Sequence, residues 1–327
     1  MPDRLSLDPW IHPRDEGAPA AIALGTMNFG KRIDAQASAR VLTHAIERGI
    51  RFFDTANAYC EGESERILGA AVRKDRERFG IATKVGFGRV GGKPEGLARA
   101  RVLAAFEESR KRLQTDWVDL YYLHVPDHAT PIEETLGAIG ELFDKGLIRA
   151  FGISNYASWQ VLEIFHACDA MGMQRPVVAQ QLYNLLIRQL DIEYFKFTRK
   201  HPIHTTAYNA LAGGLLSGRH DAAAPAPKGS RFDGNRMYQR RYWNDRMFEL
   251  VDAYQAIAES EGMSIVDLAY GWLGSRPGVD SVLVGPTSVE QLDAAIRGLE
   301  RRPSTDACTR IDQIHLAHLG TETTYAR

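Results

Sequence analysis

Short apolar runs alternate along the chain with longer stretches whose apolar residues recur at helical spacing. The first run covers 21–24, and apolar residues at helical spacing follow it over 39–46, so the two stretches predict one strand–helix unit. Further strands are predicted at 52–54, 81–85, 118–124, 150–153, 177–181, 204–208 and 281–285. Helices are predicted between them at 64–72, 97–113, from 130 onward, 158–170, 191–200, 243–260 and 264–273.

The number of these units indicates the fold. Eight strand–helix repeats in 327 residues predict an α/β protein of the (β/α)8 or TIM barrel class rather than a doubly wound sheet. No shift in composition divides the chain, so we expect a single domain over 1–327. The stretch 219–242, rich in Ala, Pro, Gly and Arg, is predicted as a long loop over the active-site end before the last strand. Residues beyond Pro303 are expected to form a C-terminal extension outside the barrel.

Two helix starts carry specific signals. Ser64 opens an amphipathic stretch and predicts a capped helix start. Thr130, Pro131 and Glu133 match the N-cap, the first helical position and the capping-box partner of a helix.

Charge and composition exclude several classes of protein. The 40 basic and 41 acidic residues give a net charge of -1, which provides no electrostatic footprint for nucleic acid or an anionic membrane. The first residues, MPDRLSLDPWIHP, lack the apolar core of a secretory signal, and no apolar run is long enough to span a membrane. We therefore expect a cytoplasmic, soluble protein without nucleic-acid or membrane partners, and the oligomeric state stays open.

Cysteines and histidines do not form a metal motif. The three cysteines are too few and too scattered for a disulfide framework or a zinc site, and they fit a reducing compartment. His124 and His128 are four residues apart, but Pro126 excludes the helix that would place them on one face. His315 and His318 are expected to face solvent.

One glycine pattern has two interpretations. Gly86, Gly88 and Gly91 form G-x-G-x-x-G after a predicted strand, and Asp116 lies where a Rossmann fold keeps its ribose-binding acid. That fingerprint requires a helix directly after the third glycine, whereas the segment 91–94, GGKP, predicts a loop. We favour the loop.

The most informative stretch is 52–69, with the sequence FFDTANAYCEGESERILG. Asp54 ends a predicted strand, and Tyr59 lies in the loop that follows it. Lys84 and His124 stand at the ends of the next two strands, or one residue away. Because the C-terminal ends of barrel strands converge at one mouth, we expect these four side chains to meet there. Each one alone has an ordinary structural explanation, but the four in this order predict an active site.

The residue types fit carbonyl reduction. Addition of a hydride to a carbonyl carbon leaves an alkoxide, which needs a proton donor and nearby positive charge. An unperturbed phenol keeps its proton until about pH 10, so we expect the Lys84 ammonium to lower the pKa of Tyr59. The Asp54 carboxylate would keep that ammonium charged, and His124 could direct a ring N–H at the carbonyl oxygen.

The order D-T-A-x-x-Y followed by G-x-S-E resembles the active-site signature of the aldo-keto reductases, and the resemblance extends from Leu24 to about Ile296. It implies an NAD(P)(H)-dependent oxidoreductase that reduces an aldehyde or ketone, or oxidises an alcohol, with Tyr59 as general acid for reduction. The alternative is a non-catalytic or weakly catalytic nicotinamide-binding subunit similar to potassium-channel β-subunits, which share the fold and the signature.

The resemblance also implies contacts to the cofactor and the substrate. The residues that match the family's cofactor site are Gly25, Thr26, Met27, Asp54, Ser154, Asn155, Gln181, Tyr208, Asn209, Leu211, Gly213, Leu215, Gly285, Thr287, Ser288 and Gln291. Tyr208 is the one expected to stack on the nicotinamide. Substrate contacts are expected from Asn28, Phe29, Tyr59, His124 and Val125, with Phe232, Tyr238 and Tyr242 as an aromatic lid.

Some positions depart from the family pattern. Cys60 follows Tyr59 where many relatives have glycine. Many relatives also have arginine near Thr287, where its guanidinium pairs with the 2′-phosphate of NADP, and Arg297 lies too far along the helix to replace it. NADP is therefore the expected cofactor by resemblance, with NAD as the alternative and a modest preference between them.

Overall fold

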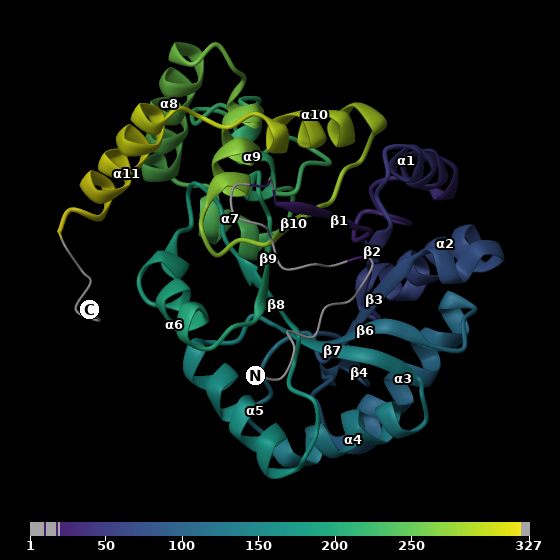
Figure 1. Cartoon of the computed structure of the whole chain (residues 1–327). Helices are drawn as coiled ribbons and strands as arrows, with labels where there is room; N and C mark the ends of the chain where they lie inside the picture. Colours follow the sequence, from purple (N-terminus) through teal and green to yellow (C-terminus); the bar gives the residue numbers. More distant parts are fainter. Residues whose placement is uncertain (1–9, 11–17, 19, 322–327) are drawn as a thin grey trace.

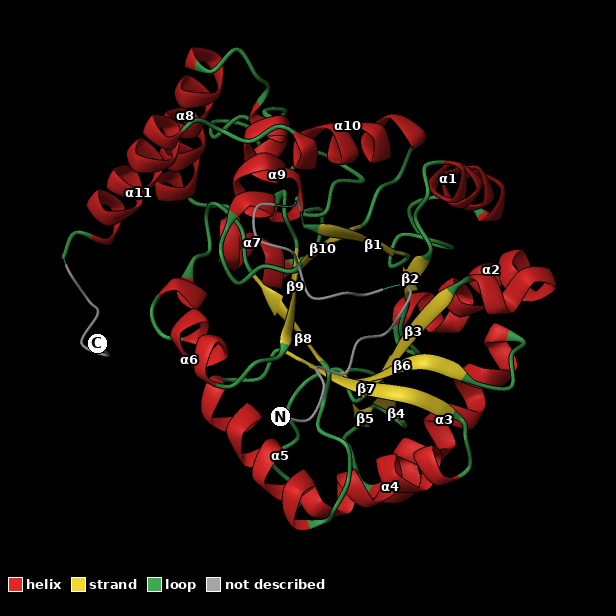
Figure 2. Cartoon of the chain, viewed as in Figure 1, coloured by secondary structure: helices red, strands yellow, loops and turns green. Residues whose placement is uncertain are grey.

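The computed structural model describes Trp10, Ala18 and residues 20–321, and it contains a closed barrel of parallel strands surrounded by helices (Figures 1 and 2). The strands follow one another around the barrel in the order β1-β10-β9-β8-β7-β6-β3-β2. They are β1 (Ala21–Gly25), β2 (Phe52–Asp54), β3 (Gly80–Val85), β6 (Val118–Leu123), β7 (Ile148–Ser154), β8 (Val178–Leu182), β9 (His204–Tyr208) and β10 (Ser281–Val284). The predicted (β/α)8 barrel is confirmed.

Helices cover the outside of the barrel (Figure 2). They are α1 (Ala35–Glu47), α2 (Glu63–Val72), α3 (Arg99–Leu113), α4 (Ile132–Asp144), α5 (Ser158–Ala170), α6 (Tyr194–Lys200), α7 (Arg236–Tyr242), α8 (Asp245–Ser260), α9 (Ile265–Ser275), α10 (Val289–Glu300) and α11 (Thr305–Leu319). Short 3-10 segments are η1 (Tyr59–Gly62), η2 (Arg73–Arg78), η3 (Gln189–Asp191) and η4 (Ala212–Ser217).

Alternate residues of each strand divide the apolar core into two parts. Ala82, Leu120, Tyr122, Ala150 and Val178 belong to a small cluster inside the barrel, whereas their neighbours in sequence pack against the helices. Two residues further along a strand, a side chain points to the same side again. The apolar cluster therefore fills part of the barrel interior, and the C-terminal ends of the strands can present polar side chains.

The glycine pattern at 86–91 leads into a hairpin. β4 (Arg89–Val90) pairs antiparallel with β5 (Lys93–Pro94), and helix α3 begins only at Arg99. The loop interpretation is confirmed, because the position where a dinucleotide-binding fingerprint needs a helix is occupied by this hairpin.

Both predicted helix starts are shifted in the structure. α2 begins at Glu63, and Gly62 rather than Ser64 precedes it, because the Ser64 hydroxyl is turned inward to Thr26 and Thr55. α4 begins at Ile132, because Pro131 has an extended ψ of 136° and takes the capping position without a side-chain hydrogen bond. The Thr130 hydroxyl donates to Asp127 instead of capping the helix.

The segment 219–242 is not irregular throughout, because its last residues form α7. Phe232 and Tyr242 are completely buried, so they anchor the segment rather than cover a substrate. The Tyr242 hydroxyl accepts hydrogen bonds from Asn184 at 3.1 Å and Asn209 at 2.7 Å. Of the three aromatic residues expected in a lid, Tyr238 alone keeps some exposure.

The C-terminal extension is helix α11, which packs against α8 on the outside of the barrel (Figure 1). A buried arginine attaches it: Arg188 donates to Asp312 of α11 and to Asp191, both at 2.7 Å, and its guanidinium lies 5.0 Å from the Trp272 ring centroid. His315 is half-buried in this interface, so the expectation that it faces solvent is wrong.

We expect His315 to make the protein sensitive to acid. Burial first, and then the charge of Arg188, lowers the pKa of His315 from 6.5 to about 4. The unfolded chain takes up this proton at higher pH than the folded chain, so stability falls as pH drops from 6.5 toward 4. His315→Gln should therefore reduce the loss of melting temperature on acidification through this window. His128→Gln, on an exposed loop, is the control; an equal acid loss in His315→Gln and wild type would contradict the assignment.

Candidate active site

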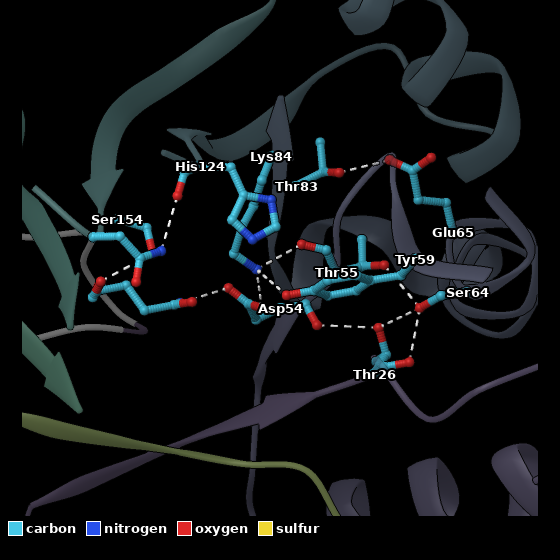
Figure 3. Close-up of polar contacts among 12 residues, drawn as sticks. Thr26, Asp54, Thr55, Tyr59, Ser64, Glu65, Thr83, Lys84, His124 and Ser154 are labelled. Atoms are coloured by element: carbon cyan, nitrogen blue, oxygen red, sulfur yellow. Dashed lines mark hydrogen bonds and ion pairs between the residues drawn. The ribbon is translucent and has the colours of Figure 1, made fainter. Parts of the chain in front are cut away.

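Asp54, Lys84 and Tyr59 form one buried cluster at the C-terminal ends of β2 and β3 (Figure 3). The Lys84 ammonium pairs with the Asp54 carboxylate, and neither side chain is more than 1% exposed. The ammonium also donates to the backbone carbonyl of Thr55 at 2.8 Å and lies 3.5 Å from the Tyr59 hydroxyl. The structure thus brings the predicted acid, cation and phenol together.

Tyr59 is held in place by the 3-10 segment that it begins. The next two residues, Cys60 and Glu61, have φ of 51° and 55°, in the left-handed region that favours glycine. Behind the segment, the Ser64 hydroxyl bonds the carbonyl and hydroxyl of Thr26, as well as the Thr55 hydroxyl, over 2.7–2.9 Å. The active-site loop is therefore tied to the ends of β1 and β2.

His124 completes the cluster from the end of β6. Its ring lies edge-on to the Tyr59 ring, with centroids 5.8 Å apart and an interplanar angle of 79°. Burial first, and then the Lys84 charge, holds the pKa of His124 well below its usual 6.5, so the imidazole is neutral near pH 7. Its Nδ1 is buried without a hydrogen-bond partner among the described residues.

The ionised pair depends on mutual support. Burial raises the pKa of Asp54, and the Lys84 charge and hydrogen bonds from Lys84 and Gln180 oppose that shift. Burial lowers the pKa of Lys84, and Asp54 opposes this change. Removal of either charge would leave the other buried and unpaired.

Tyr59 differs from our expectation. Its pKa is raised well above 10, first by burial and then by the Asp54 charge, and the Arg231 charge opposes the rise. The expected net lowering is absent, because burial and the Asp54 charge raise the pKa of Tyr59. Tyr59 is therefore protonated at neutral pH, and as a weak acid it needs nearby positive charge to release that proton.

Gln180 reaches the catalytic cluster, and Gln181 does not. Gln180 Nε2 donates to Asp54 Oδ2 at 2.9 Å, whereas Gln181 Nε2 donates to the carbonyl of Tyr156 at 2.7 Å. Successive residues of a strand point to opposite sides, so only one of the two can face the barrel interior. The assignment of Gln181 to the site was wrong by one residue.

A polar wall extends from His124 to the end of β9. Asn155, with φ of 65°, donates through Nδ2 to the His124 carbonyl and the Ser154 hydroxyl, both at 3.0 Å. Its Oδ1 accepts from the Tyr208 hydroxyl at 2.6 Å, and Ser154 donates to the Gln180 carbonyl at 2.9 Å. The predicted residues Ser154, Asn155 and Tyr208 therefore lie in one chain of hydrogen bonds beside His124.

Two backbone segments follow that wall. Asn209 Oδ1 accepts a hydrogen bond from the Gly213 N–H at 2.7 Å. Gly213 has a φ of 72°, and a Cβ at this position would come within 2.7 Å of the Tyr238 ring. Leu215 is buried, and so it can offer only its backbone to a ligand, while Leu211 is half-buried. In the second segment Ser288 caps α10, and Gln291 Oε1 accepts from the N–H and hydroxyl of Thr287 at 2.8 and 3.0 Å.

Residues 21–316 match the profile described as the Aldo/keto reductase family. The chain belongs to this family. The sequence-based resemblance is confirmed.

Individual relatives of the chain are named either as reductases or as a channel subunit. The aflatoxin B1 aldehyde reductase member 2 of Rattus norvegicus is 38% identical over 309 residues, covering 88% of this chain and 82% of the relative. The aldo-keto reductase family 7 member A3 of Homo sapiens is 39% identical over 303 residues, covering 86% and 89%. A probable voltage-gated potassium channel subunit beta of Arabidopsis thaliana is 32% identical over 283 residues, covering 85% and 86%.

The C-terminal end of β1 contacts the site. Gly25 pairs with Asp54 across the two strands, the Thr26 N–H donates to the Asp54 carbonyl at 2.9 Å, and the Met27 carbonyl accepts from Cys60 Sγ at 3.6 Å. Asn28 Nδ2 donates to the Gly285 carbonyl at 2.8 Å, so this end also contacts the loop after β10. Phe29 is completely buried, so the expectation that it contacts substrate is wrong.

Arg231 lies near the site but was not predicted from the sequence. Its guanidinium donates to Asn28 Oδ1 at 2.8 Å and lies 5.5 Å from the Tyr238 ring centroid. Its charge affects the pKa of Tyr59, Cys60 and Arg32, which shows that it lies close to the catalytic loop. The residue stands in the irregular part of 219–242, where no periodic pattern predicts a direction.

Metal sites and membrane-spanning helices are absent from the described part of the chain. Within the described ranges, no three His, Cys, Asp or Glu side chains are grouped to hold a metal ion. The helices of the described part are all too short or too polar to cross a lipid bilayer.

Proposed function

We propose that this protein is an NAD(P)H-dependent reductase that converts an aldehyde or ketone into an alcohol and can run the reverse oxidation. The observation that carries the proposal is the Tyr59 hydroxyl 3.5 Å from a buried ammonium, which is itself paired with Asp54. A protonated phenol, a fixed positive charge that stabilises the phenolate and a neutral imidazole together fit protonation of a carbonyl oxygen.

In the proposed mechanism each of the chain's residues has a distinct role. The bound nicotinamide supplies the hydride. Tyr59 donates its proton to the carbonyl oxygen and takes one back in the oxidation direction. Lys84 stabilises the phenolate that remains, Asp54 keeps Lys84 charged and oriented, and neutral His124 donates a ring N–H to the same oxygen. Because these side chains are already held in position, they need no rearrangement when negative charge develops on the carbonyl oxygen.

The residues beyond the catalytic cluster fit a nicotinamide dinucleotide. Tyr208 presents a flat ring beside Asn155 and Ser154, which suits an aromatic carboxamide. The N-terminus of α10 offers backbone N–H groups, which suit a phosphate.

NADP(H) is the proposed cofactor, with only a modest preference over NAD(H). Thr287 and Ser288 stand near the N-terminus of α10, and Arg297 is paired with Asp267 at 3.1 Å, so it is not free to hold a 2′-phosphate. Neutral hydrogen bonds are roughly half as strong as charge-assisted ones. We expect the ratio of kcat/KM for NADPH over NADH to stay below about a thousandfold, or about 4 kcal/mol. A larger ratio would show that a basic 2′-phosphate contact exists elsewhere.

An aldehyde is the proposed substrate, because one of the relatives named above is an aflatoxin B1 aldehyde reductase. Arg231 adds a chemical preference. Among the described residues its guanidinium donates to the neutral amide of Asn28 and pairs with no carboxylate, so its charge can attract an anionic group on the substrate.

The alternative function is a regulatory subunit, because one relative is named as a probable channel subunit. The complete catalytic cluster favours turnover.

We propose that residues 1–327 act as one domain in the cytoplasm, consistent with free Cys60, Cys168 and Cys308.

A substrate screen tests the proposal. Aldehydes, ketones and aldoses are mixed with the protein and each reduced cofactor, and oxidation of the nicotinamide is followed by absorbance. We expect turnover with at least one aldehyde. Tight cofactor binding without turnover of any carbonyl compound would favour the regulatory alternative.

A further inference from the structure

Glu95 carries a buried carboxylate beside the active site. The proposed mechanism assigns no role to this carboxylate. Its side chain is 2% exposed. Oε2 accepts from the backbone N–H of Gly86 at 2.8 Å and Gly88 at 3.2 Å. Oε1 accepts from Asn57 Nδ2 at 2.7 Å and Arg101 Nε at 3.1 Å. One carboxylate therefore joins the loop after β2, the loop after β3 and helix α3.

Two glycines of the 86–91 pattern bind this carboxylate through their backbone. Gly86 has φ of +108°, which L side chains rarely adopt, and a Cβ on Gly88 would come within 3.1 Å of Glu95 Oε2. Their two N–H groups converge on one oxygen, as they do in backbone nests that bind anions. The nest is occupied by the chain's own Glu95, and the Glu95 N–H returns a hydrogen bond to the Gly88 carbonyl at 2.9 Å.

The residue between the two glycines is Phe87. Its side chain is 54% exposed, although its ring centroid lies 5.1 Å from that of His124. The exposed Phe87 ring therefore borders the space in front of the His124 imidazole. The bonds of Gly86 and Gly88 to Glu95 fix the backbone on both sides of Phe87.

The same carboxylate acts on the catalytic loop. Asn57 stands two residues before Tyr59, and its backbone N–H donates to the Lys84 carbonyl at 3.2 Å. Its side chain is held by Glu95. Loss of the carboxylate would therefore loosen both the loop that carries Phe87 and the loop that carries Tyr59.

We propose that Glu95 is a positioning residue that holds Phe87 against His124, and that Phe87 is the apolar wall for an aryl group on the substrate carbonyl. This inference rests on the proposed carbonyl reduction. It goes further by assigning a specificity-determining side chain and the buried charge that orients it. Glu95 itself touches no reacting atom.

A double-mutant cycle tests the link. Benzaldehyde and propanal are the probes, and the readout is the ratio of their kcat/KM values. Phe87→Ala should lower the ratio about tenfold, mainly through a higher KM for benzaldehyde. Glu95→Ala should lower the ratio similarly and add nothing in the Phe87→Ala background, because both changes remove the same wall. Independent effects that multiply, or an unchanged ratio in either single variant, would overturn the inference.

Two variants separate positioning from a loss of structure. Glu108→Gln removes the other ion pair of Arg101, at 2.8 Å, without touching either loop, and should leave the ratio unchanged. Glu95→Gln keeps the shape of the side chain and one acceptor oxygen. Because Asn57 Oδ1 is buried without a partner in the described part of the chain, the Asn57 amide can turn and accept the new N–H. Glu95→Gln should therefore restore part of the ratio lost in Glu95→Ala.

Hydrogen–deuterium exchange separates failure of this inference from failure of the proposed function. If wild type reduces neither aldehyde, the proposed reduction of such carbonyls fails, and exchange decides the positioning role by itself. We expect Glu95→Ala to raise exchange over 86–94 and 56–59 but not over the strands opposite them. Unchanged exchange in both segments would overturn the role of Glu95.

Discussion

Tyr59→Phe should lose nearly all turnover while it binds the cofactor as tightly as wild type. In the proposed mechanism the Tyr59 hydroxyl is the proton donor, and the substitution removes this atom without changing the shape of the ring. A positioned general acid typically contributes a factor of about 10² to 10⁴, so we expect kcat with an unactivated ketone to fall at least about a hundredfold. Steady-state kinetics and quenching of cofactor fluorescence measure the two quantities.

The control for this variant is Tyr121→Phe. Tyr121 is also buried, on β6, but its hydroxyl bonds the Val102 carbonyl at 3.4 Å, away from the catalytic cluster. This variant should keep wild-type kcat. If Tyr59→Phe retained a tenth of the wild-type kcat, the proton would have to come from another group, and the assigned role of Tyr59 would be wrong.

Lys84→Met should have the second large effect, on both stability and the pH profile. It leaves the Asp54 carboxylate, 1% exposed, without its cation, and breaking a buried pair in this way costs about 3–5 kcal/mol. It also removes the positive charge nearest the Tyr59 hydroxyl, so the pKa of Tyr59, already raised by burial and Asp54, should rise further. Oxidation of an alcohol uses the ionised phenol as base. The increase of kcat with pH in that direction should therefore move to higher pH.

Chemical denaturation and a pH series of kcat measure the two effects separately. The double variant Lys84→Met/Asp54→Asn leaves no unpaired buried charge, so it should recover much of the lost stability and still lack the ammonium. An unchanged pH profile in a Lys84→Met enzyme that remains active would show that Lys84 does not influence Tyr59.

The strand–helix order was predictable from the sequence because barrel strands are buried on both faces. The run 118–123 is buried along its whole length, and the helices between such strands have one apolar side. The same order predicted that Asp54, Lys84 and His124 would meet, since parallel strands place their C-terminal ends together. Helix starts were less certain, because Ser64 and Thr130 found partners outside their own helices.

The choice between Gln180 and Gln181 required the structure. Both residues end one strand, and sequence pattern alone does not show which of two neighbours faces the barrel interior. The register of β8 decides it and places Gln180, rather than Gln181, beside Asp54. A shift of one residue reverses the direction of every side chain in a strand, so small errors of register change the predicted site.

By itself, the sequence determined the barrel, its family and the four proposed catalytic positions, because these depend on local periodicity and on the order of the strands. Only the tertiary structure decided how Arg231 and Phe87 face the site, that Phe29 is buried, and that burial rather than Lys84 dominates the pKa of Tyr59. These properties depend on contacts between segments far apart in the chain. Glu95 is the clearest case, because its carboxylate orients two loops that no local pattern connects.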